Sequence, residues 1–449
     1  MITTDLLIIG GSDAGISAAL RARELDDQVS ITLLLSDDFP NFSICGIPYA
    51  LSGEVTDWHH LAHRTRSDLE AYHIAFHSNT VADKIDSEAH QVLAHNSDGS
   101  QVFAYQKLLV ATGARPKSLG VTAPTAATHV LRTMADFFAI EDLLTTNKPE
   151  RVAIVGAGYV GLEVTEALIK RGIAVTMIQR GQEVLSTVDS AMGQEVHHVL
   201  SAHGVAVLTD QTVTEIKSAK KGYMVTTSAD ETIHADLILV VIGVVPNSQL
   251  LAQAGAQLDA ATRAVKVDDA MRTSLPDIYA AGDLVLTKHR LLGNTYLPLG
   301  TTAHKQGRIA GATMLGRSAV FQGVLGSQVV TVFGLVTART GLTEAEARTA
   351  GFDPVVSTSY VDDHKAYYPN AHQITIRLIA DRQSGQLLGA QLMGQATSEV
   401  AKRTDIFATA IYHHMTVAEF SDLDLTYSPV VGSPWDAVQL AAQALERQL

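Results

Sequence analysis

The run Leu6-Leu7-Ile8-Ile9-Gly10-Gly11-Ser12-Asp13-Ala14-Gly15 decides the fold, because an apolar strand leads directly into a glycine turn. A helical pattern follows from Ile16 to Leu25, and a second apolar strand runs from Val29 to Leu35. Glycines in such a turn let the backbone approach a pyrophosphate, and the start of the helix offers free amides. One turn of this kind is weak evidence, because glycine turns also serve plain packing.

The same order of elements returns in the run Arg151-Val152-Ala153-Ile154-Val155-Gly156-Ala157-Gly158-Tyr159-Val160-Gly161. Its helix is expected from Leu162 to about Arg171, and its next strand over 174–178. All three glycines of the pattern are present here (Gly156, Gly158 and Gly161), whereas Ser12 takes the middle position of the first turn. Two such units predict doubly wound parallel sheets that bind two dinucleotides.

Other segments complete this outline. Apolar strands end in small-residue turns at 108–116 and 277–283. From about Val324 the pattern alternates as in antiparallel strands, over 329–333, 374–379 and 387–393, and it becomes helical near 400–414. We therefore expect a separate C-terminal α+β domain.

The bulk composition excludes several classes of protein. A chain of 449 residues should form two or three domains. Its formal charge of −14 argues against nucleic acid or an anionic membrane surface as a partner. The N-terminus reads as a buried strand and not as a signal peptide, and the longest apolar stretch, 237–245, is too short to cross a bilayer. A single cysteine allows no intrachain disulfide, which fits a cytoplasmic protein.

Eighteen histidines raise the question of a metal site. The pairs His59-His60, His197-His198 and His413-His414 are adjacent, so their side chains cannot share one face of a helix. We expect no metal site.

The motifs together resemble the pyridine nucleotide–disulfide oxidoreductases. Both glycine turns, Ala111-Thr112-Gly113, Ala280-Ala281-Gly282-Asp283 and Ser43-Ile44-Cys45-Gly46-Ile47-Pro48-Tyr49 occur in that family's order. The chain is most similar to the single-cysteine branch, which contains coenzyme A disulfide reductases, NADH oxidases and NADH peroxidases. The resemblance covers essentially the whole chain, including 402–405 and 424–429.

This resemblance implies a division into domains and a set of binding residues. The FAD domain would comprise 1–118 and 245–323, the NAD(P)H domain 119–244, and the dimerisation domain of a homodimer 324–449. FAD would be held by Gly10, Gly15, Ala111, Thr112, Gly113 and Asp283, and the nicotinamide nucleotide by Gly156, Gly158, Gly161 and Glu163.

Cys45 is the residue expected to carry the redox chemistry. A thiol reacts as thiolate, which is favoured at a helix start or beside positive charge, and Gly46 and Pro48 predict a helix entry here. With no second cysteine, oxidised Cys45 would be a sulfenate or a mixed disulfide with a small thiol. By resemblance, Tyr427 with Tyr367 or Tyr368 would protonate the departing sulfur; alternatively, these tyrosines pack at the dimer interface.

Four positions depart from the reductase or peroxidase patterns: Asp13, Glu24, Ile44 and His304. A cation lost at position 24 should weaken binding of a phosphorylated thiol, and Asp13 stands where peroxidases carry a His. The acceptor therefore stays open between a small disulfide, coenzyme A disulfide being the nearest family example, and oxygen or peroxide. A third alternative is a flavin redox sensor or electron-transfer protein.

Nucleotide preference depends on the end of each unit's second strand. An acid there normally binds the ribose hydroxyls, but the second unit has Gln179 and Arg180, which favour the 2′-phosphate of NADPH. In the first unit the acid is also missing from Leu35, so we expect Ser36 or Asp37 to contact the FAD ribose.

Overall fold

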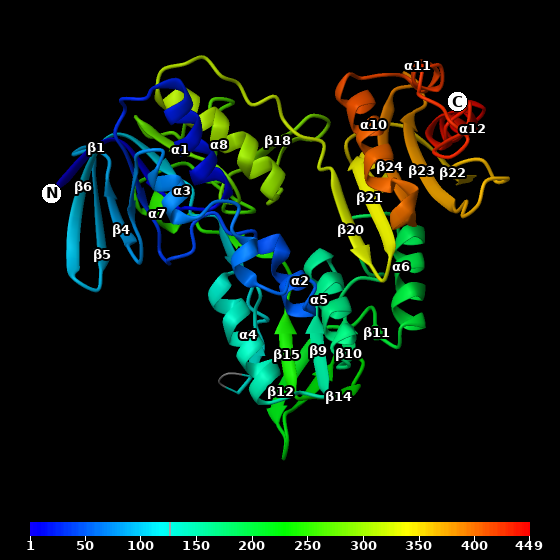
Figure 1. Cartoon of the computed structure of the whole chain (residues 1–449), viewed down its shortest axis with the longest axis horizontal. Coiled ribbons are helices and arrows are strands. Elements are labelled where there is room, and N and C mark those ends of the chain that lie inside the picture. The colour runs from blue at the N-terminus through cyan, green and yellow to red at the C-terminus, as the bar shows by residue number, and fades with distance from the viewer. Residues whose placement is uncertain (125–126) are drawn as a thin grey trace.

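Two sheets with parallel cores and one antiparallel sheet dominate the computed structural model, which describes residues 1–124 and 127–449 (Figure 1). The predicted α/β architecture with an α+β C-terminal part is confirmed. The expected domain boundaries stay a prediction.

The first glycine turn belongs to a sheet of order β3-β2-β1-β6-β5-β4, in which β17 also pairs with β6. Its strands β1, β2, β3, β6 and β17 run parallel, and the hairpin β4–β5 extends it antiparallel. The strands are β1 (Ile2–Ile9), β2 (Ile31–Leu34), β3 (Ile74–His77), β4 (Val81–Asp86), β5 (Gln91–Asn96), β6 (Gly99–Val110) and β17 (Ile278–Ala280).

Alternating side chains of β1 bury both faces of this sheet, as expected for a parallel sheet. Leu6 and Ile8 pack with the helices α1 (Asp13–Leu25) and α8 (Gly300–Met314), while Leu7 and Ile9 pack on the opposite face. The two helices lie very close. A Cβ at Gly307 would stand 2.2 Å from the Ala14 carbonyl oxygen, and one at Gly311 2.3 Å from that of Ala18.

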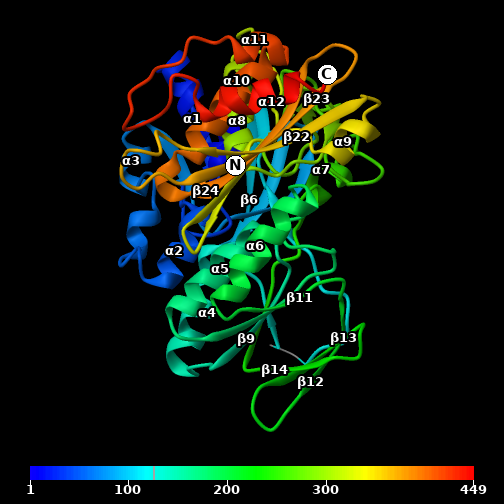
Figure 2. The ribbon, with the colours of Figure 1, turned by 90° about the vertical axis from the view of Figure 1, so that its right-hand side faces the viewer.

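The second glycine turn belongs to the parallel sheet β11-β10-β9-β15-β8. Helices cover one face of it and a three-stranded antiparallel sheet covers the other (Figures 1 and 2). The main-sheet strands are β8 (Thr128–His129), β9 (Arg151–Val155), β10 (Ala174–Ile178), β11 (Ala206–Leu208) and β15 (Leu237–Val240). The helices are α4 (Met134–Thr146), α5 (Tyr159–Lys170) and α6 (Ser190–Ala202), and the covering strands β12 (Val213–Ser218), β13 (Tyr223–Thr227) and β14 (Thr232–Ala235).

The C-terminal part is an antiparallel sheet of order β20-β21-β24-β23-β22, with α10 and α12 packed in its core. The strands predicted at 329–333, 374–379 and 387–393 and the helix near 400–414 are all present. Its elements are β20 (Gln328–Val332), β21 (Leu335–Gly341), α9 (Glu344–Thr349), β22 (Pro354–Asp362), β23 (Gln373–Asp381), β24 (Leu387–Gln395), α10 (Val400–Tyr412), α11 (Val417–Ser421) and α12 (Ala437–Glu446).

Short elements connect these units. β7 and β16 pair antiparallel where the chain passes between the first two sheets. The remaining elements are α2 (Ile47–Ser52), α3 (Arg66–Glu70), β7 (Ala114–Pro116), β16 (Val244–Pro246), α7 (Gln249–Gln253), β18 (Thr287–His289) and β19 (Gly293–Thr295).

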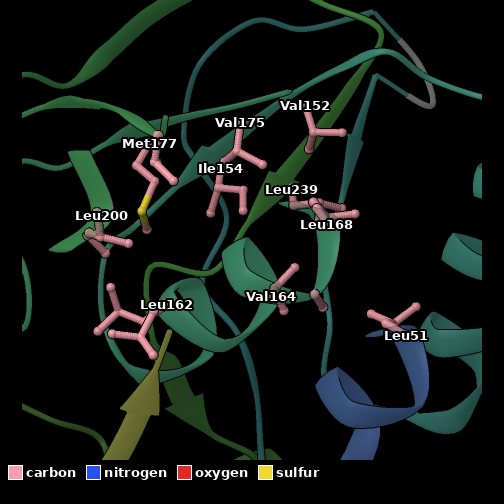
Figure 3. Packing of buried hydrophobic residues seen from close by; sticks show 14 of the residues in the cluster. Leu51, Val152, Ile154, Leu162, Val164, Leu168, Val175, Met177, Leu200 and Leu239 are labelled. Carbon is pink, nitrogen blue, oxygen red and sulfur yellow. The ribbon is translucent and has the colours of Figure 1, made fainter. Parts of the chain in front are cut away.

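The core of the second sheet extends to the helix that follows Cys45. Leu51 of α2 is fully buried in the same cluster as Ile154, Leu168 and Leu239 (Figure 3). α2 therefore lies against α5, as Figure 1 also shows. This packing holds Cys45 between the two dinucleotide-type sheets.

Candidate functional site

Cys45 lies in a 3-10 turn, Ile44–Gly46, that leads into α2. Pro48 stands in the first turn of α2, as the sequence predicted for a helix entry. A Cβ at Gly46 would stand 2.5 Å from the Leu61 side chain, so only glycine fits there without displacing that leucine. The Cys45 side chain is exposed, whereas the neighbouring Ile44 packs on the core that α2 shares with the second sheet. The thiol is thus held in place and remains accessible.

The charges around Cys45 differ from the expectation of a thiolate beside positive charge. Desolvation by the surrounding protein raises the pKa of Cys45 most, and the carboxylates of Asp13, Glu163 and Asp283 raise it further. Arg132 acts in the opposite direction, but it forms an ion pair with Asp283 at 2.5 Å. The chain's own residues therefore favour the thiol over the thiolate.

The two glycine turns have nearly identical backbones. Gly10 has φ +113° and Gly156 φ +109°, a region that suits glycine. A Cβ at Gly15 would stand 1.9 Å from the Gly10 carbonyl oxygen, and one at Gly161 2.1 Å from that of Gly156. These four glycines permit close backbone packing.

Open space in front of each turn fits a dinucleotide. A Cβ at Gly158 or at Gly113 would meet nothing within 4 Å. Gly158 and Ser12 are the N-caps of α5 and α1, and neither makes a side-chain cap, so no cap side chain occupies the first-turn amides. The residues present therefore fit a pyrophosphate at both helix starts.

The other residues expected to hold FAD gather at the ends of β6 and β17. The Thr112 hydroxyl donates to the Asn247 carbonyl oxygen at 2.9 Å, and the Asn247 amide donates to the Thr112 carbonyl oxygen at 2.9 Å. Ala111 is buried, and the Gly113 carbonyl oxygen accepts from the Asn247 backbone amide. Asn247 and Arg132, which pairs with Asp283, were not predicted; no motif marks either of them.

The residues that follow the second strand of each unit, β2 in the first and β10 in the second, also differ. Ser36 is exposed after β2, while Asp37 accepts a hydrogen bond from the Phe39 backbone amide at 2.9 Å and has its pKa raised by burial. After β10, the Gln179 side chain is engaged with the Ala157 amide at 3.3 Å. Arg180 is exposed, and no carboxylate of the described residues pairs with it.

Glu163 lies on α5 of the second unit, and its carboxylate is one of the charges that oppose ionisation of Cys45. Burial raises its pKa to about 7, and the nearby Glu166 contributes. Glu166 itself is compensated, because it pairs with Lys170 at 2.9 Å and accepts from the Phe333 amide. Glu163 therefore changes its charge near neutral pH.

The predicted tyrosines lie together on the C-terminal part. Tyr427 and Tyr367 share a hydrogen bond, and desolvation and then Tyr367 raise the pKa of Tyr427. Both are exposed, as is Tyr368. Among the described residues of one chain, no hydrogen bond joins any of these tyrosines to Cys45.

Buried Arg403 holds both tyrosine-bearing loops. It donates to the carbonyl oxygens of Asp363 at 2.7 Å and Val431 at 3.4 Å, and pairs with Asp436 at 3.0 Å. The segment 402–405 carries part of the family resemblance, but no role was predicted for Arg403. A charged residue in an amphipathic helix is normally expected to face solvent, so the burial of Arg403 was not predictable from the sequence.

Three of the four departing positions meet along the seam between α1 and α8. His304 lies 3.4 Å from the Asp13 carboxylate and 2.7 Å from the Ser17 hydroxyl. Glu24 pairs with Arg21 at 2.8 Å and with Arg308 at 3.3 Å, so its charge is compensated. Two arginines share this one carboxylate, so the seam keeps positive charge beside Glu24, although the sequence alone suggested a loss of positive charge.

No metal centre or membrane span is found in the part of the chain that the structure describes. Across 1–124 and 127–449, no three His, Cys, Asp or Glu side chains gather to hold a metal ion. Within the same ranges, no helix is long and apolar enough to cross a bilayer.

Comparison with known proteins identifies the family. The model of the pyridine nucleotide-disulphide oxidoreductases matches residues 4–307, and that of their dimerisation domain matches 327–437. An "NAD(P)H sulfur oxidoreductase (CoA-dependent)" of Pyrococcus abyssi is 30% identical over 444 residues, 98% of each chain. A "coenzyme A disulfide reductase" of Staphylococcus aureus is 28% identical and covers 97% of this chain and 98% of its own.

Two further proteins extend this comparison. An "NADH oxidase" of Methanocaldococcus jannaschii is 28% identical, with 99% of each chain covered. The solved NAD-dependent persulfide reductase from A. fulgidus has a TM-score of 0.95 and 32% identity, covering 99% of this chain and 83% of that one. FAD and NAD(P)H are the cofactors of these enzymes as a family. The chain belongs to the pyridine nucleotide-disulphide oxidoreductases, in their single-cysteine branch.

Proposed function

We propose that this oxidoreductase uses NAD(P)H to reduce a small disulfide or persulfide at Cys45, with a coenzyme A-containing thiol as the nearest acceptor class. The observation that carries the proposal is the position of Cys45: the chain's one cysteine is exposed, on a turn held between the two sheets that carry the glycine turns. A buried core cysteine would have had no such access.

The residues for each cofactor follow from the fit described above. Gly10, Gly15, Ala111–Gly113 and Asp283 would hold FAD, with Ser36 or Asp37 at its ribose. Gly156, Gly158, Gly161, Glu163 and Arg180 would line the nicotinamide nucleotide site. When bound, FAD supplies a carrier that accepts a hydride and passes two electrons on to sulfur. Arg180 is exposed and pairs with no carboxylate of the described residues, which favours the 2′-phosphate of NADPH.

Cys45 would act as the nucleophile. Its thiolate attacks one sulfur of the acceptor disulfide, forms a mixed disulfide and releases the other half as a thiolate. Two electrons then reduce the mixed disulfide, which frees the second thiol and restores Cys45. In total, one disulfide, one NAD(P)H and one proton give two thiols and NAD(P)⁺.

The seam between α1 and α8 supports an acceptor that carries phosphate. Arg21 and Arg308 both pair with Glu24, so two guanidinium groups share one carboxylate there. Arginine binds phosphate oxygens through paired hydrogen bonds. The relatives named for coenzyme A-dependent reactions agree with this chemistry.

A second subunit is part of the proposal. The loops around Tyr367 and Tyr427 expose an aromatic and apolar surface that also includes Tyr368, Val430, Val431 and Trp435. The dimerisation family model spans this surface. We infer a homodimer in which one subunit's tyrosines protonate the thiolate that leaves Cys45 of the other. A lone reactive thiol fits the reducing cytoplasm.

The second candidate is an NADH oxidase that reduces oxygen through a Cys45 sulfenate, favoured by the relative of that name. Anaerobic reduction of the holoenzyme with NADPH, followed by separate additions of coenzyme A disulfide, oxygen and peroxide, distinguishes the two. We expect rapid reoxidation of the flavin absorbance by the disulfide. Rapid reoxidation by oxygen alone would refute the reductase.

A further inference from the structure

Four polar side chains form a row across the antiparallel sheet of the C-terminal part. The row is Gln328 on β20, Arg339 on β21, Gln391 on β24 and Arg377 on β23, and each residue stands directly opposite the next. Opposed residues point to the same face of a sheet. Val330, two residues after Gln328, points to that face as well and is buried in the core of the second sheet. This polar row therefore faces the unit that carries the second glycine turn.

One end of the polar row binds Asp189 of that unit from two strands. Arg377 Nε donates to Asp189 Oδ2 at 2.7 Å, and Gln391 Nε2 donates to the same oxygen at 2.8 Å. The Asp189 backbone amide donates in return to Gln391 Oε1 at 2.7 Å. Gln391 is 1% exposed, so these hydrogen bonds are shielded from water. The carboxylate is thus held at three points by the C-terminal sheet.

Asp189 gives up a local role for these contacts. It is the N-cap of α6, where an aspartate side chain normally accepts from the amides of the first helical turn. No such cap forms here, and the carboxylate is turned to the C-terminal sheet instead. Departures from a local rule of this kind concentrate at functional sites.

The other end of the polar row reaches the second glycine turn, where β20 lies beside α5 (Figure 1). Gln328 Oε1 accepts a hydrogen bond from the hydroxyl of Tyr159, the first residue of α5. Tyr159 directly follows Gly158, which faces the open space described above. Its hydroxyl also lies 3.1 Å from the Thr187 hydroxyl, and Arg339 donates to the Thr187 carbonyl oxygen.

The segment 185–189 connects both ends of the polar row to the glycine turn itself. The Leu185 amide donates at 2.8 Å to the carbonyl oxygen of Ala157, which lies between the first two glycines of the turn. Leu185 is buried and has φ +50°, a conformation that leucine rarely adopts. Backbone strain of this kind persists only where surrounding contacts hold it. The contacts of the polar row to Thr187 and Asp189 supply that hold.

The arginines of the polar row are already compensated within the C-terminal part. Arg377 pairs with Glu344 at 2.9 Å, and Arg339 pairs with Glu346 at 2.6 Å. Arg339 is also 7% exposed. These guanidinium groups are therefore suited to holding the second unit in place and not to binding the phosphate of a ligand.

We propose that the polar row positions the second glycine turn for the nicotinamide nucleotide. Gln328 acts through the Tyr159 hydroxyl, and Arg377 with Gln391 acts through Asp189. The C-terminal part thus has a role at the nucleotide site besides dimerisation. The proposal rests on the proposed assignment of the nucleotide to this turn, and it does not depend on the final electron acceptor.

The test removes one contact at each end of the polar row. Gln328→Leu removes the acceptor of the Tyr159 hydroxyl, and Arg377→Met removes one donor to Asp189. NADP⁺ binds without turnover, so its Kd for the oxidised holoenzyme can be measured by isothermal titration calorimetry. We expect this Kd to rise about three- to ten-fold in each variant, the size of one lost hydrogen bond.

The two half-reactions separate positioning from general damage. Flavin reduction by NADPH should slow by a similar factor, whereas reoxidation of the photoreduced flavin by coenzyme A disulfide should keep the wild-type rate. If the wild type is reoxidised by oxygen alone, the proposed function fails, and oxygen replaces the disulfide in this comparison. The polar row is then still tested.

Matched variants control for folding and charge. Arg382→Gln removes an exposed arginine just after β23, one that pairs with Asp353, and should leave the Kd for NADP⁺ unchanged. Gln328→Glu keeps an acceptor oxygen and should retain most of the affinity. Deuterium exchange of the peptide 184–192 should be faster in Arg377→Met, while that of β9 stays slow. If Arg377→Met does not fold, the Gln328 variants carry the test.

A double variant decides the route. If Gln328 acts through Tyr159, then Gln328→Leu should raise the Kd for NADP⁺ little further in a Tyr159→Phe background. An equal rise in both backgrounds would overturn this route. An unchanged NADP⁺ affinity in folded Gln328→Leu and Arg377→Met, or an equal loss in Arg382→Gln, would overturn the proposal as a whole.

Discussion

The two strand–turn–helix repeats share their backbone but present different electrostatics to Cys45. Both turns begin with a glycine near φ +110°, and both pack the helix on the turn through a second glycine. Asp13 of the first repeat and Glu163 of the second both oppose ionisation of Cys45. The same fold unit thus contributes one carboxyl group from each repeat to the electrostatics of the thiol.

The difference lies in how each acid is compensated. His304, His63 and Arg132 favour the charged form of Asp13. Glu163 has no such partner among the groups that act on it most strongly: burial and Glu166 raise its pKa to about 7. The first repeat therefore presents a carboxylate coupled to a histidine, and the second a carboxyl group that ionises near neutral pH. Backbone similarity alone does not make the two sites equivalent.

The largest effect is expected when the Cys45 thiol, the group on which both acids act, is removed. Cys45→Ser should retain FAD and still accept hydride from NADPH, but lose turnover with the disulfide by about a thousand-fold or more, because the nucleophile is gone. Stopped-flow reduction and steady-state turnover measure the two steps separately. Retained turnover would place Cys45 outside the electron path, and the two acids would then have no common target.

The next largest effect is expected within the second glycine turn, where one glycine packs against the backbone and another faces the open space for the ligand. Gly161→Ala places a Cβ 2.1 Å from a carbonyl oxygen and should lower the free energy of unfolding by about 1–3 kcal/mol. Gly158→Ala meets nothing within 4 Å at an ordinary φ of −87°, so stability should change by less than about 0.5 kcal/mol.

For NADPH affinity the order of the two variants should reverse, so that Gly158→Ala is the more affected. The new methyl group would occupy the open space where the pyrophosphate fits, so the Kd of Gly158→Ala for NADPH should rise. Urea unfolding and fluorescence titration measure the two effects. Equal stability losses in both variants would show that the space in front of Gly158 is not a binding surface.

Much of this arrangement was predictable from the sequence. Strand and turn residues such as Ile154 and Gly156 repeat a local pattern, and local patterns determine parallel units with short turns. Arg132, Asn247 and Arg403 could not be found in this way, because each meets one main partner (Asp283, Thr112 and Asp436, respectively) across more than thirty residues of sequence. Charge compensation has the same origin in part: Arg21 lies one helical turn from Glu24, but its second partner, Arg308, is brought beside it only by the packing of α8.

Glu163 offers a test of pH dependence in the second repeat. Its pKa is about 7 in the folded chain, against an ordinary 4.5, so the wild type loses stability as pH rises between these values. Glu163→Gln removes this loss and should be about 1–2 kcal/mol more stable than the wild type at pH 8, with no difference at pH 4. Urea unfolding at both pH values measures it.

A matched control is Glu195→Gln on α6, an exposed glutamate, which should show no such pH dependence. The same Glu163→Gln variant should also alkylate faster at Cys45 above pH 7, because a negative charge that opposes the thiolate has been removed. A stability difference that is equal at both pH values would mean that Glu163 does not titrate as the comparison requires.

The smallest effect is expected at the ends of the second strands, where the repeats differ again. After β2 the acid is Asp37, bound to the Phe39 amide, while after β10 a free Arg180 follows Gln179. Arg180→Gln should raise the KM for NADPH about ten-fold and leave that for NADH nearly unchanged, since only NADPH offers a 2′-phosphate to the guanidinium. Arg171→Gln, at an arginine that pairs with Glu141 at the far end of α5, is the control. An equal rise for both nucleotides would mean that Arg180 supports the turn and does not read the phosphate, and the second repeat would then lack a determinant of nucleotide choice at this position.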